Sequence, residues 1–275
     1  MRRFISCLFL LTIVTPLAVR AEHEGKVQIV LLGDSTTEGS VPRRHVKEGP
    51  HLEDVVRQLL EAEGDLPPCN VINLGQSGDL IRRLLDNGRY DRQLAKLPGV
   101  DYIFIRYGIN DQARRENFAE NFMPDYHELI GRIRRDHASA KIVLMTIIPY
   151  LDETKSHLVN GLVRQVAEKE KLTLFDIYPR YAEELKKQGQ NALNYRRFPS
   201  EGIPEKLRPF VKPFLHGDPP KVEVMDNRLD AHFGSLPGWY SDRHPNLAGY
   251  HVIGDETAKF LAPLLRERKA ATPRR

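Results

Sequence analysis

The chain has 275 residues, of which 41% are hydrophobic and 28% are charged, and its formal net charge is +4. This length suits one large domain or two small ones, either of which can bury a proper core. The composition is ordinary for a globular protein, and the absence of low-complexity tracts and of solenoid-length repeats excludes disordered and extended repeat proteins.

The first 21 residues differ in composition from the rest of the chain. They read MRRFISCLFLLTIVTPLAVRA, which is two arginines, an apolar stretch, and small residues at −3 and −1 of a cut after Ala21. Because this is the layout of a secretory signal, we expect residues 1–21 to be removed and the mature protein to be exported and soluble. An uncleaved anchor is the alternative, but the apolar stretch is short for a bilayer. Cys7 lies inside that stretch and not at the cut, which argues against a lipoprotein.

Removal of this segment also changes the charge of the protein. It takes away three arginines and no acids, so Lys+Arg falls from 41 to 38 against 37 Asp+Glu, and the net charge falls from +4 to +1. A nearly neutral chain gives no support for a polybasic nucleic-acid surface. Cys69 is the only cysteine that remains, which excludes an intramolecular disulfide and makes a structural zinc site unexpected. We expect no nucleic-acid partner, no metal, no cofactor and no stable membrane insertion.

Short apolar segments alternate with longer amphipathic ones along the chain. Five segments rich in β-branched residues predict strands buried on both faces: 26–32, 70–74, 101–107, 141–148 and 172–177. Apolar residues at three- and four-residue spacing predict helices over 51–64, 80–88, 121–137 and 155–171, and a last helix begins with Pro245. This alternation predicts an α/β fold, a three-layer sandwich with a central parallel sheet of about five strands.

One segment interrupts the alternation of strands and helices. Residues 189–240 are rich in proline, glycine and charge, with FPSEGIPEKLRPFVKPFLHGDPP at their centre. The segment is too long for an ordinary connection. We therefore predict a single domain over residues 22–275, with an irregular insertion at about 189–240 that covers one end of the sheet and is not a second domain.

The sequence GDST follows directly on the first predicted strand. It places Ser35 at the carboxyl end of that strand, which is where ligands bind in sheets of this kind. Gly33 permits a sharp exit from the strand, and Ser35 can present its hydroxyl and its N–H to a cleft. Serine and threonine are also favoured as helix N-caps, so a purely structural role is the alternative.

Three further segments bring polar groups to the same rim. NLGQSGD follows the second strand and supplies Gly78, and GIND follows the third strand and supplies Asn110. DRHPN precedes the last helix and supplies Asp242 and His244. A hydroxyl, an imidazole with a neighbouring carboxylate, and neutral hydrogen-bond donors are the groups that acyl transfer through a serine requires.

These four segments resemble the four blocks of the SGNH (GDSL-type) hydrolases, which are named for a serine, a glycine, an asparagine and a histidine. They occur in the family's order and together extend over nearly the whole mature chain. The resemblance implies the flavodoxin-like fold of that family, with Ser35 as nucleophile and His244 as general base. It also implies an oxyanion hole formed by the N–H groups of Ser35 and Gly78 and the amide of Asn110. Gly78 is preferred to Gly75 because the family's glycine is followed by an acidic or polar residue.

The last block departs from the family pattern. The family places the acid of the triad three residues before the histidine, whereas position 241 here is a serine and Asp242 lies two residues before His244. A short loop can still bring Asp242 to the imidazole, and we expect it to complete the triad. The alternative is that a backbone carbonyl or another acid accepts the hydrogen bond from His244.

Several other residues are weaker candidates for the site. Arg106 and Tyr107 stand at a strand end close to Asn110 and are candidates for lining the pocket, with core packing or a surface salt bridge as the alternative. Trp239 is a candidate for an apolar or sugar-stacking wall, with simple packing as the alternative. His216 and Asp218 lack the spacing of metal ligands on a helix or hairpin, which favours solvated loop residues.

Together these features predict an exported serine esterase that acts on a small-molecule or polysaccharide ester. Exported members of the family often remove acetyl groups from polysaccharides, and the polar insertion favours a wet, sugar-facing cleft, so we expect a carbohydrate O-acetylesterase. A lipid esterase of the lysophospholipase kind is the alternative among enzymes. The alternative that is not an enzyme is a carbohydrate-binding relative without catalytic activity, and the displaced Asp242 is the feature that favours it.

Overall fold

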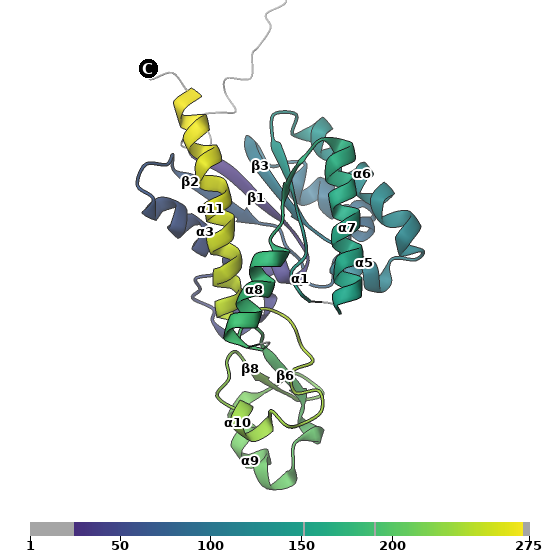
Figure 1. Cartoon of the computed structure of the whole chain (residues 1–275), viewed down its shortest axis with the longest axis vertical. Coiled ribbons are helices and arrows are strands. Elements are labelled where there is room, and N and C mark those ends of the chain that lie inside the picture. The colour runs from purple at the N-terminus through teal and green to yellow at the C-terminus, as the bar shows by residue number, and fades with distance from the viewer. Residues whose placement is uncertain (1–24, 151, 190, 272–275) are drawn as a thin grey trace, which may run out of the picture.

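A computed structural model describes residues 25–150, 152–189 and 191–271 (Figure 1). The expected leader over residues 1–21 lies outside the described residues and stays a prediction. Within the described part of the chain, no helix combines the length and the apolar character needed to cross a membrane.

The main body is built on a five-stranded parallel sheet in the order β2-β1-β3-β4-β5. Its strands are β1 (Val27–Gly33), β2 (Cys69–Asn73), β3 (Val100–Arg106), β4 (Lys141–Met145) and β5 (Thr173–Phe175). The predicted parallel sheet is confirmed, and each strand lies within the predicted segment or one residue beyond it. Because β1 pairs with both β2 and β3, the strand order reverses beside β1, and such reversals create the crevice in which ligands bind.

Helices cover both faces of the sheet, as Figure 1 shows. One face carries α4 (Ile81–Asp86), α6 (Phe118–Asp136) and α7 (Glu153–Glu170). The other carries α3 (Leu52–Ala62), α8 (Tyr178–Gln188) and α11 (Leu247–Ala271). Short elements at the strand ends are α1 (Ser35–Glu38), α2 (Ser40–His45), α5 (Ile109–Arg114) and the π-helical turn η2 (Tyr90–Leu94).

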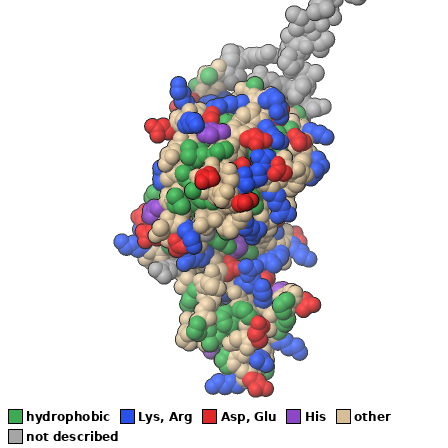
Figure 2. Space-filling view, turned by 90° about the vertical axis from the view of Figure 1, so that its right-hand side faces the viewer, with side chains coloured by type: hydrophobic (Ala, Val, Ile, Leu, Met, Phe, Trp, Pro, Cys, Tyr) green, Lys and Arg blue, Asp and Glu red, His purple; other side chains and the backbone are tan. Residues whose placement is uncertain are grey.

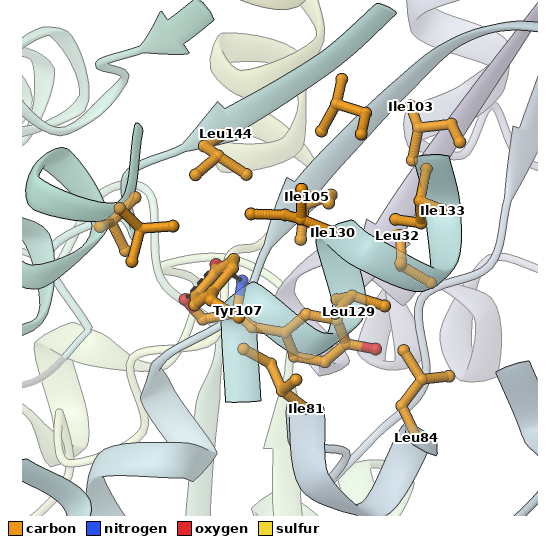
Figure 3. Packing of buried hydrophobic residues seen from close by; sticks show 14 of the residues in the cluster. Leu32, Ile81, Leu84, Ile103, Ile105, Tyr107, Leu129, Ile130, Ile133 and Leu144 are labelled. Atoms are coloured by element: carbon orange, nitrogen blue, oxygen red, sulfur yellow. Dashed lines mark hydrogen bonds between the residues drawn. The ribbon is translucent and has the colours of Figure 1, made fainter. Parts of the chain in front are cut away.

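The two hydrophobic cores follow from the alternation of side chains along each strand. In β1, Val30 and Leu32 pack with α4 and α6, whereas Ile29 and Leu31 pack with α3 and α11. Figure 3 shows the first of these cores, in which residues of β1, β3 and β4 face leucines and isoleucines of α4 and α6. All four of these β1 side chains are almost completely buried, which fixes the register of the strand at its carboxyl end.

Residues 196–240 form a small lobe at the lower end of the molecule in Figure 1. It contains a three-stranded antiparallel sheet of β6 (Arg196–Pro199), β8 (Lys221–Val224) and β7 (Leu215–His216), in that order. Short helical elements complete it: η3 (Ser200–Gly202), η4 (Glu205–Leu207), α9 (Arg208–Val211), η5 (Lys212–Phe214) and α10 (Asp230–Phe233).

The small lobe is more regular than its composition predicted. It has its own cluster of buried hydrophobic side chains, among them Phe198, Val222, Phe233 and Trp239. Its strands are only two to four residues long and its glycines and prolines are frequent, so no periodic pattern marks it in the sequence. The small sheet is stabilised by side chains from distant parts of the sequence that pack around Trp239, which is fully buried.

The chain leading into the small lobe runs beside the loop that carries His244. The Tyr195 N–H donates to the His244 carbonyl at 2.9 Å, and the Asn246 N–H donates to the Leu193 carbonyl at 2.9 Å. Asn194 and Pro245 form an isolated antiparallel bridge between these hydrogen bonds. The loop before α11 is therefore held by the backbone that begins the small lobe.

Candidate active site

Ser35 lies at the turn where β1 gives way to α1. A Cβ on Gly33 would come within 2.2 Å of Thr37 Oγ1, so this position requires glycine. Asp34 caps the helix, because its Oδ1 accepts hydrogen bonds from Thr36 N–H at 2.9 Å and Thr36 Oγ1–H at 2.8 Å. Since Asp34 takes the capping role, the Ser35 hydroxyl is left for other contacts, and its N–H belongs to the first helical turn, where amides have no helical partner.

Ser35, His244 and Asp242 form one continuous chain of polar contacts. Ser35 Oγ lies 2.9 Å from His244 Nε2. On the other side of the ring, His244 Nδ1 lies 2.6 Å from Asp242 Oδ1, which also accepts the backbone N–H of His244 at 3.0 Å. When Nδ1 carries the proton and donates a hydrogen bond to the carboxylate, the lone pair of Nε2 faces the Ser35 hydroxyl. The imidazole can then accept the proton of that hydroxyl.

Asp242 is buried and ionised. Burial alone would raise its pKa, but the hydrogen bonds and charge of His244, together with the charge of Arg197, outweigh that effect and lower the pKa. Arg197 comes from β6 in the small lobe, and its Nε lies 2.8 Å from Asp242 Oδ2. The small lobe thus supplies the cation that faces the second oxygen of this carboxylate.

Tyr150 is a site residue that the sequence analysis missed. Its hydroxyl oxygen lies 3.1 Å from His244 Nδ1, and the two rings meet edge to face with centroids 5.0 Å apart. Burial raises the pKa of Tyr150, so the phenol stays neutral. Its position beyond the end of β4 is the signal that could have found it, because the other site residues also follow strand ends.

Three hydrogen-bond donors face the pocket beside Ser35. Gly78 has a φ of +71°, and its N–H has no hydrogen-bond partner among the described residues. The N–H of Gly75, by contrast, already donates to Asn73 Oδ1 at 2.9 Å, which supports the choice of Gly78. Asn110 Nδ2 donates one hydrogen to the Asp79 carbonyl at 3.0 Å and keeps a second one. With the N–H of Ser35, these groups can hold an oxyanion.

A buried network behind the pocket fixes the loop that presents these donors. Asp79 pairs with the Arg89 guanidinium, and the Tyr107 hydroxyl donates to Asp79 Oδ2 at 2.9 Å. Arg89 also donates to the Leu74 carbonyl at 2.9 Å. Because the Asp79 carbonyl accepts from Asn110, this network determines where the amide of Asn110 points.

The structure corrects the expectation that Arg106, Tyr107 and Trp239 line the pocket. Arg106 is buried beneath the turn and donates to the Thr36 carbonyl, and Tyr107 is buried in the network just described. Trp239 lies inside the small lobe, where its Nε1–H donates to Asp230 at 2.8 Å. For each residue the packing alternative is the right one, because its side chain points toward a core and not toward the strand end.

The pocket at Ser35 has a volume of about 600 Å³, and its walls expose polar and apolar atoms in similar amounts. Four segments of the main body, the His244 loop and β6 contribute to it. Besides Ser35, Gly78, Asn110 and His244, its walls are formed by Glu38, Ser40, Val41, Arg43, Arg44, Ser77, Ile109, Arg114, Tyr150 and Arg197. Few of these side chains are apolar, so the pocket offers little surface to a long acyl chain.

One set of side chains among the described residues has the spacing of metal ligands. Ligand atoms of His45, His216 and Glu223 lie within 4.8 Å of one another. His45 Nε2 is 3.0 Å from Glu223 Oε2, and the Arg44 guanidinium approaches the same carboxylate at 3.6 Å. Because a permanent cation already faces Glu223, we assign these contacts to the junction between α2 and the small lobe.

Asp111, next to Asn110, is fully buried, and burial raises its pKa to about 7. The unfolded chain loses this proton near pH 4, so between about pH 4 and 7 the folded state binds more protons and the free energy of unfolding falls as pH rises. At about 1.4 kcal/mol per unit of pKa, the loss is several kcal/mol.

Asp111→Asn is expected to remove this pH dependence, because an asparagine side chain does not titrate. Its amide oxygen can still accept the Ile81 N–H that Asp111 Oδ1 accepts at 2.9 Å, so the hydrogen bond is kept. Urea denaturation of both proteins near pH 5 and near pH 7.5 measures the difference. Equal pH dependence of the unfolding free energy in the two proteins would show that Asp111 is not the group responsible.

A parallel sheet whose strand order reverses beside β1 carries a serine, a histidine and an aspartate in mutual contact at the end of that strand. The sequence profile described as "GDSL-like Lipase/Acylhydrolase family" matches residues 31–199. The chain belongs to this family and is a carboxylic ester hydrolase.

Solved structures share the fold at low sequence identity. LAE5, an alpha/beta hydrolase enzyme from the metagenome of Lake Arreo, Spain, is 19% identical, with 86% of this chain and 94% of that chain covered and a TM-score of 0.56. Axe2, an acetylxylan esterase from Geobacillus stearothermophilus, is 19% identical, with 90% and 96% covered and a TM-score of 0.55. The lipase/acylhydrolase from Enterococcus faecalis is 19% identical, with 90% and 99% covered and a TM-score of 0.51. No curated protein sequence matches the chain significantly.

Proposed function

We propose that the protein is an exported carbohydrate O-acetylesterase that forms an acyl-enzyme on Ser35. The observation that carries the proposal is the chain of contacts from Ser35 Oγ to His244 Nε2 at 2.9 Å and from His244 Nδ1 to Asp242 Oδ1 at 2.6 Å. A hydroxyl becomes a useful nucleophile when a positioned base takes its proton, and this geometry supplies the base and the carboxylate that orients it.

The reaction proceeds in two halves. Ser35 Oγ attacks the ester carbonyl as its proton passes to His244 Nε2, and the N–H groups of Ser35 and Gly78 and the amide of Asn110 stabilise the oxyanion. The bond to the alcohol then breaks, and His244 returns the proton to the leaving oxygen. Water attacks the acyl-enzyme with His244 again as base, which releases the acid and restores the Ser35 hydroxyl.

The lining of the pocket supports a small acyl group on a sugar over a long acyl chain on a lipid. Of the residues that line it, Val41, Ile109 and Tyr150 are the hydrophobic ones, whereas a fatty acyl chain needs a continuous apolar channel. Axe2, which shares the fold, is an acetylxylan esterase, and this likeness also supports the acetyl group. The lipase/acylhydrolase from Enterococcus faecalis shares the fold too, so lipid esters remain the second candidate.

The remaining alternative, a catalytically silent sugar-binding relative, rested on the displaced acid. Asp242 lies two residues before His244, yet its Oδ1 reaches Nδ1 at 2.6 Å. This contact supports Asp242 as the acid of the triad, and it favours the esterase over a silent relative.

Release of p-nitrophenol from acetate, butyrate and octanoate esters tests the proposal. We expect hydrolysis that falls steeply with acyl length and disappears in Ser35→Ala. Deacetylation of an acetylated oligosaccharide, followed as acetate release, then tests the sugar. Faster hydrolysis of octanoate than of acetate would favour the lipid esterase, and activity that survives in Ser35→Ala would contradict the nucleophile.

Asn110→Ala is expected to lower kcat by roughly a hundred- to a thousandfold, because a donor to the oxyanion acts mainly in the transition state. KM for p-nitrophenyl acetate should change much less. Asn121→Ala, at a half-buried asparagine of α6 whose amide donates to the Glu116 carbonyl at 2.9 Å, is the matched control. A rise in KM with unchanged kcat would assign Asn110 to ground-state binding instead.

Export is proposed from the layout of residues 1–21. When the full-length chain is produced in a bacterium that recognises such signals, the mature protein in the exported fraction should begin at Glu22. N-terminal sequencing measures this directly. Replacing both arginines of the leader, Arg2 and Arg3, by glutamate should slow export, and an uncut N-terminus in the membrane fraction would support an anchor instead.

A further inference from the structure

Arginines crowd the mouth of the pocket at Ser35. Arg43 and Arg44 come from α2, Arg114 from α5 and Arg197 from β6, and Glu38 is the only carboxylate in the wall formed by the described residues. Figure 2 shows acidic and basic side chains interspersed over one face of the molecule. The chain as a whole is also nearly balanced, with 41 basic and 37 acidic residues. The excess of positive charge at the pocket is therefore local.

Two of these arginines are already neutralised by carboxylates. Arg43 pairs with Glu53, and Arg197 pairs with Asp242 at 2.8 Å. Among the described residues Glu38 forms no ion pair with the other two, and its Oε2 accepts hydrogen bonds from the N–H and the hydroxyl of Ser77 at 2.7 and 2.6 Å.

The other two arginines in the pocket wall are less completely paired with carboxylates. Arg114 pairs with no carboxylate among the described residues, and Nη1 donates to the Gly78 carbonyl at 3.2 Å. Arg44 is exposed, and its nearest carboxylate is Glu223 at 3.6 Å, which also contacts His45. A guanidinium presents a planar fork of donors, and carboxylates and sulfates are the groups that match it.

The position of Arg114 places this charge close to the reacting ester. Arg114 lies four residues after Asn110 on α5, so both side chains lie on one face of the helix. Its contact with the Gly78 carbonyl puts the guanidinium beside the residue whose N–H faces the oxyanion. An acetyl group carries no charge, so an anion bound here belongs to the alcohol portion of the substrate.

We propose that Arg114 and Arg44 bind an anionic group on the sugar that carries the acetyl ester, and that this group is the carboxylate of a uronic acid. The substrate class is then O-acetylated acidic oligosaccharides, in preference to neutral ones such as acetylated xylan. This inference rests on the proposed esterase function of Ser35 and specifies its substrate.

The test compares acetate release from acetylated oligogalacturonate with acetate release from acetylated xylo-oligosaccharide. The wild type should show at least a tenfold higher kcat/KM on the acidic substrate. In Arg44→Gln/Arg114→Gln this ratio should fall to near one, mainly through KM, because ground-state binding is lost. Arg83→Gln, at an exposed arginine of α4 away from the pocket, should keep the wild-type ratio. Raising NaCl from about 0.05 M to about 0.5 M should lower the ratio in the wild type, because salt screens exposed charges.

A binding measurement separates this inference from the proposed function. Calorimetric titration of Ser35→Ala with unacetylated oligogalacturonate requires no turnover, and the two arginine substitutions in that background should weaken binding at least tenfold. Equal kcat/KM on acidic and neutral substrates, with hydrolysis that still depends on Ser35, would overturn the inference and leave the esterase standing. Absence of hydrolysis with intact, arginine-dependent binding would overturn the esterase alone. Tighter binding of a sulfated xylo-oligosaccharide than of oligogalacturonate would overturn the carboxylate assignment.

Discussion

Replacing Ser35 or His244 by alanine is expected to lower kcat for p-nitrophenyl acetate by roughly a millionfold, the scale found for serine hydrolases that lose either group. The two residues act as one unit, because the hydroxyl is reactive only while His244 Nε2, 2.9 Å away, accepts its proton. The double variant should therefore be no slower than either single variant, since nothing remains of the unit after the first substitution.

The controls for this prediction are an exposed serine and an exposed histidine elsewhere in the fold. Ser139→Ala, before β4, and His251→Ala, on the exposed side of α11, should keep near wild-type kcat. Circular dichroism and thermal unfolding confirm that the inactive variants are folded. If the losses in the two single variants multiplied in the double variant, Ser35 and His244 would be acting independently, and the proposed proton transfer between them would be wrong.

Asp242→Asn is expected to lower kcat by about ten-thousandfold, the effect of the same change in other Ser–His–Asp sites. The amide would favour the imidazole tautomer whose proton lies on Nε2, and that nitrogen could then no longer accept the Ser35 proton. This experiment tests the departure from the family spacing directly. A loss of less than tenfold would show that Asp242 does not orient His244 and that another group, such as the Tyr150 hydroxyl at 3.1 Å, takes that role.

Arg197→Gln should give a smaller loss that depends on pH, because Arg197 acts through Asp242. Removal of the guanidinium 2.8 Å from Oδ2 raises the pKa of Asp242, so the acidic limb of the kcat/KM profile should move to higher pH. Arg197→Lys restores the charge and should recover part of the shift. A uniform loss at every pH, with no recovery by lysine, would indicate that Arg197 only packs against the loop.

The main body could be read from the sequence because its strands and most of its helices carry their own periodic patterns. The strands are continuous apolar runs, and α3, α6 and α7 have apolar residues at helical spacing. The helix α8 was missed because it is polar and follows β5 closely, so its residues merge with the preceding segment. The segment of the small lobe was predicted as an insertion, but its antiparallel sheet was not, because its strands pair over distances that no local pattern records.

The site was predictable to the extent that its residues lie where strands end. Ser35, Gly78 and Asn110 occupy such turns, and all three line the pocket. Arg106 ends β3 and Tyr107 follows it directly, but strand alternation places Tyr107 on the same face as Ile103 and Ile105, inside the core. Applying that alternation to the last residues of each strand would have corrected the prediction.

Arg197 could not be found from the sequence because its role comes from tertiary contact alone. It lies 45 residues before Asp242, in a segment whose composition resembles that of a loop. Arg44 and Arg114 lie on short helices at the rim, and only the closed fold shows that they face one pocket. Charged residues that are distant in the sequence can be assigned to one pocket only when the tertiary structure is known.

Ser35 on one side of the site, and the loop of His244 and Asp242 on the other, are held in place by different parts of the structure. Ser35 follows β1, a strand paired on both sides in the sheet, whereas the loop of His244 and Asp242 is held through the bridge between Asn194 and Pro245 and through Arg197. Local opening of the small lobe would separate the base from the nucleophile while the five-stranded sheet stays intact. Inactivation on heating should therefore precede global unfolding, and the rate of that opening, not the stability of the sheet, would set the working lifetime of the enzyme.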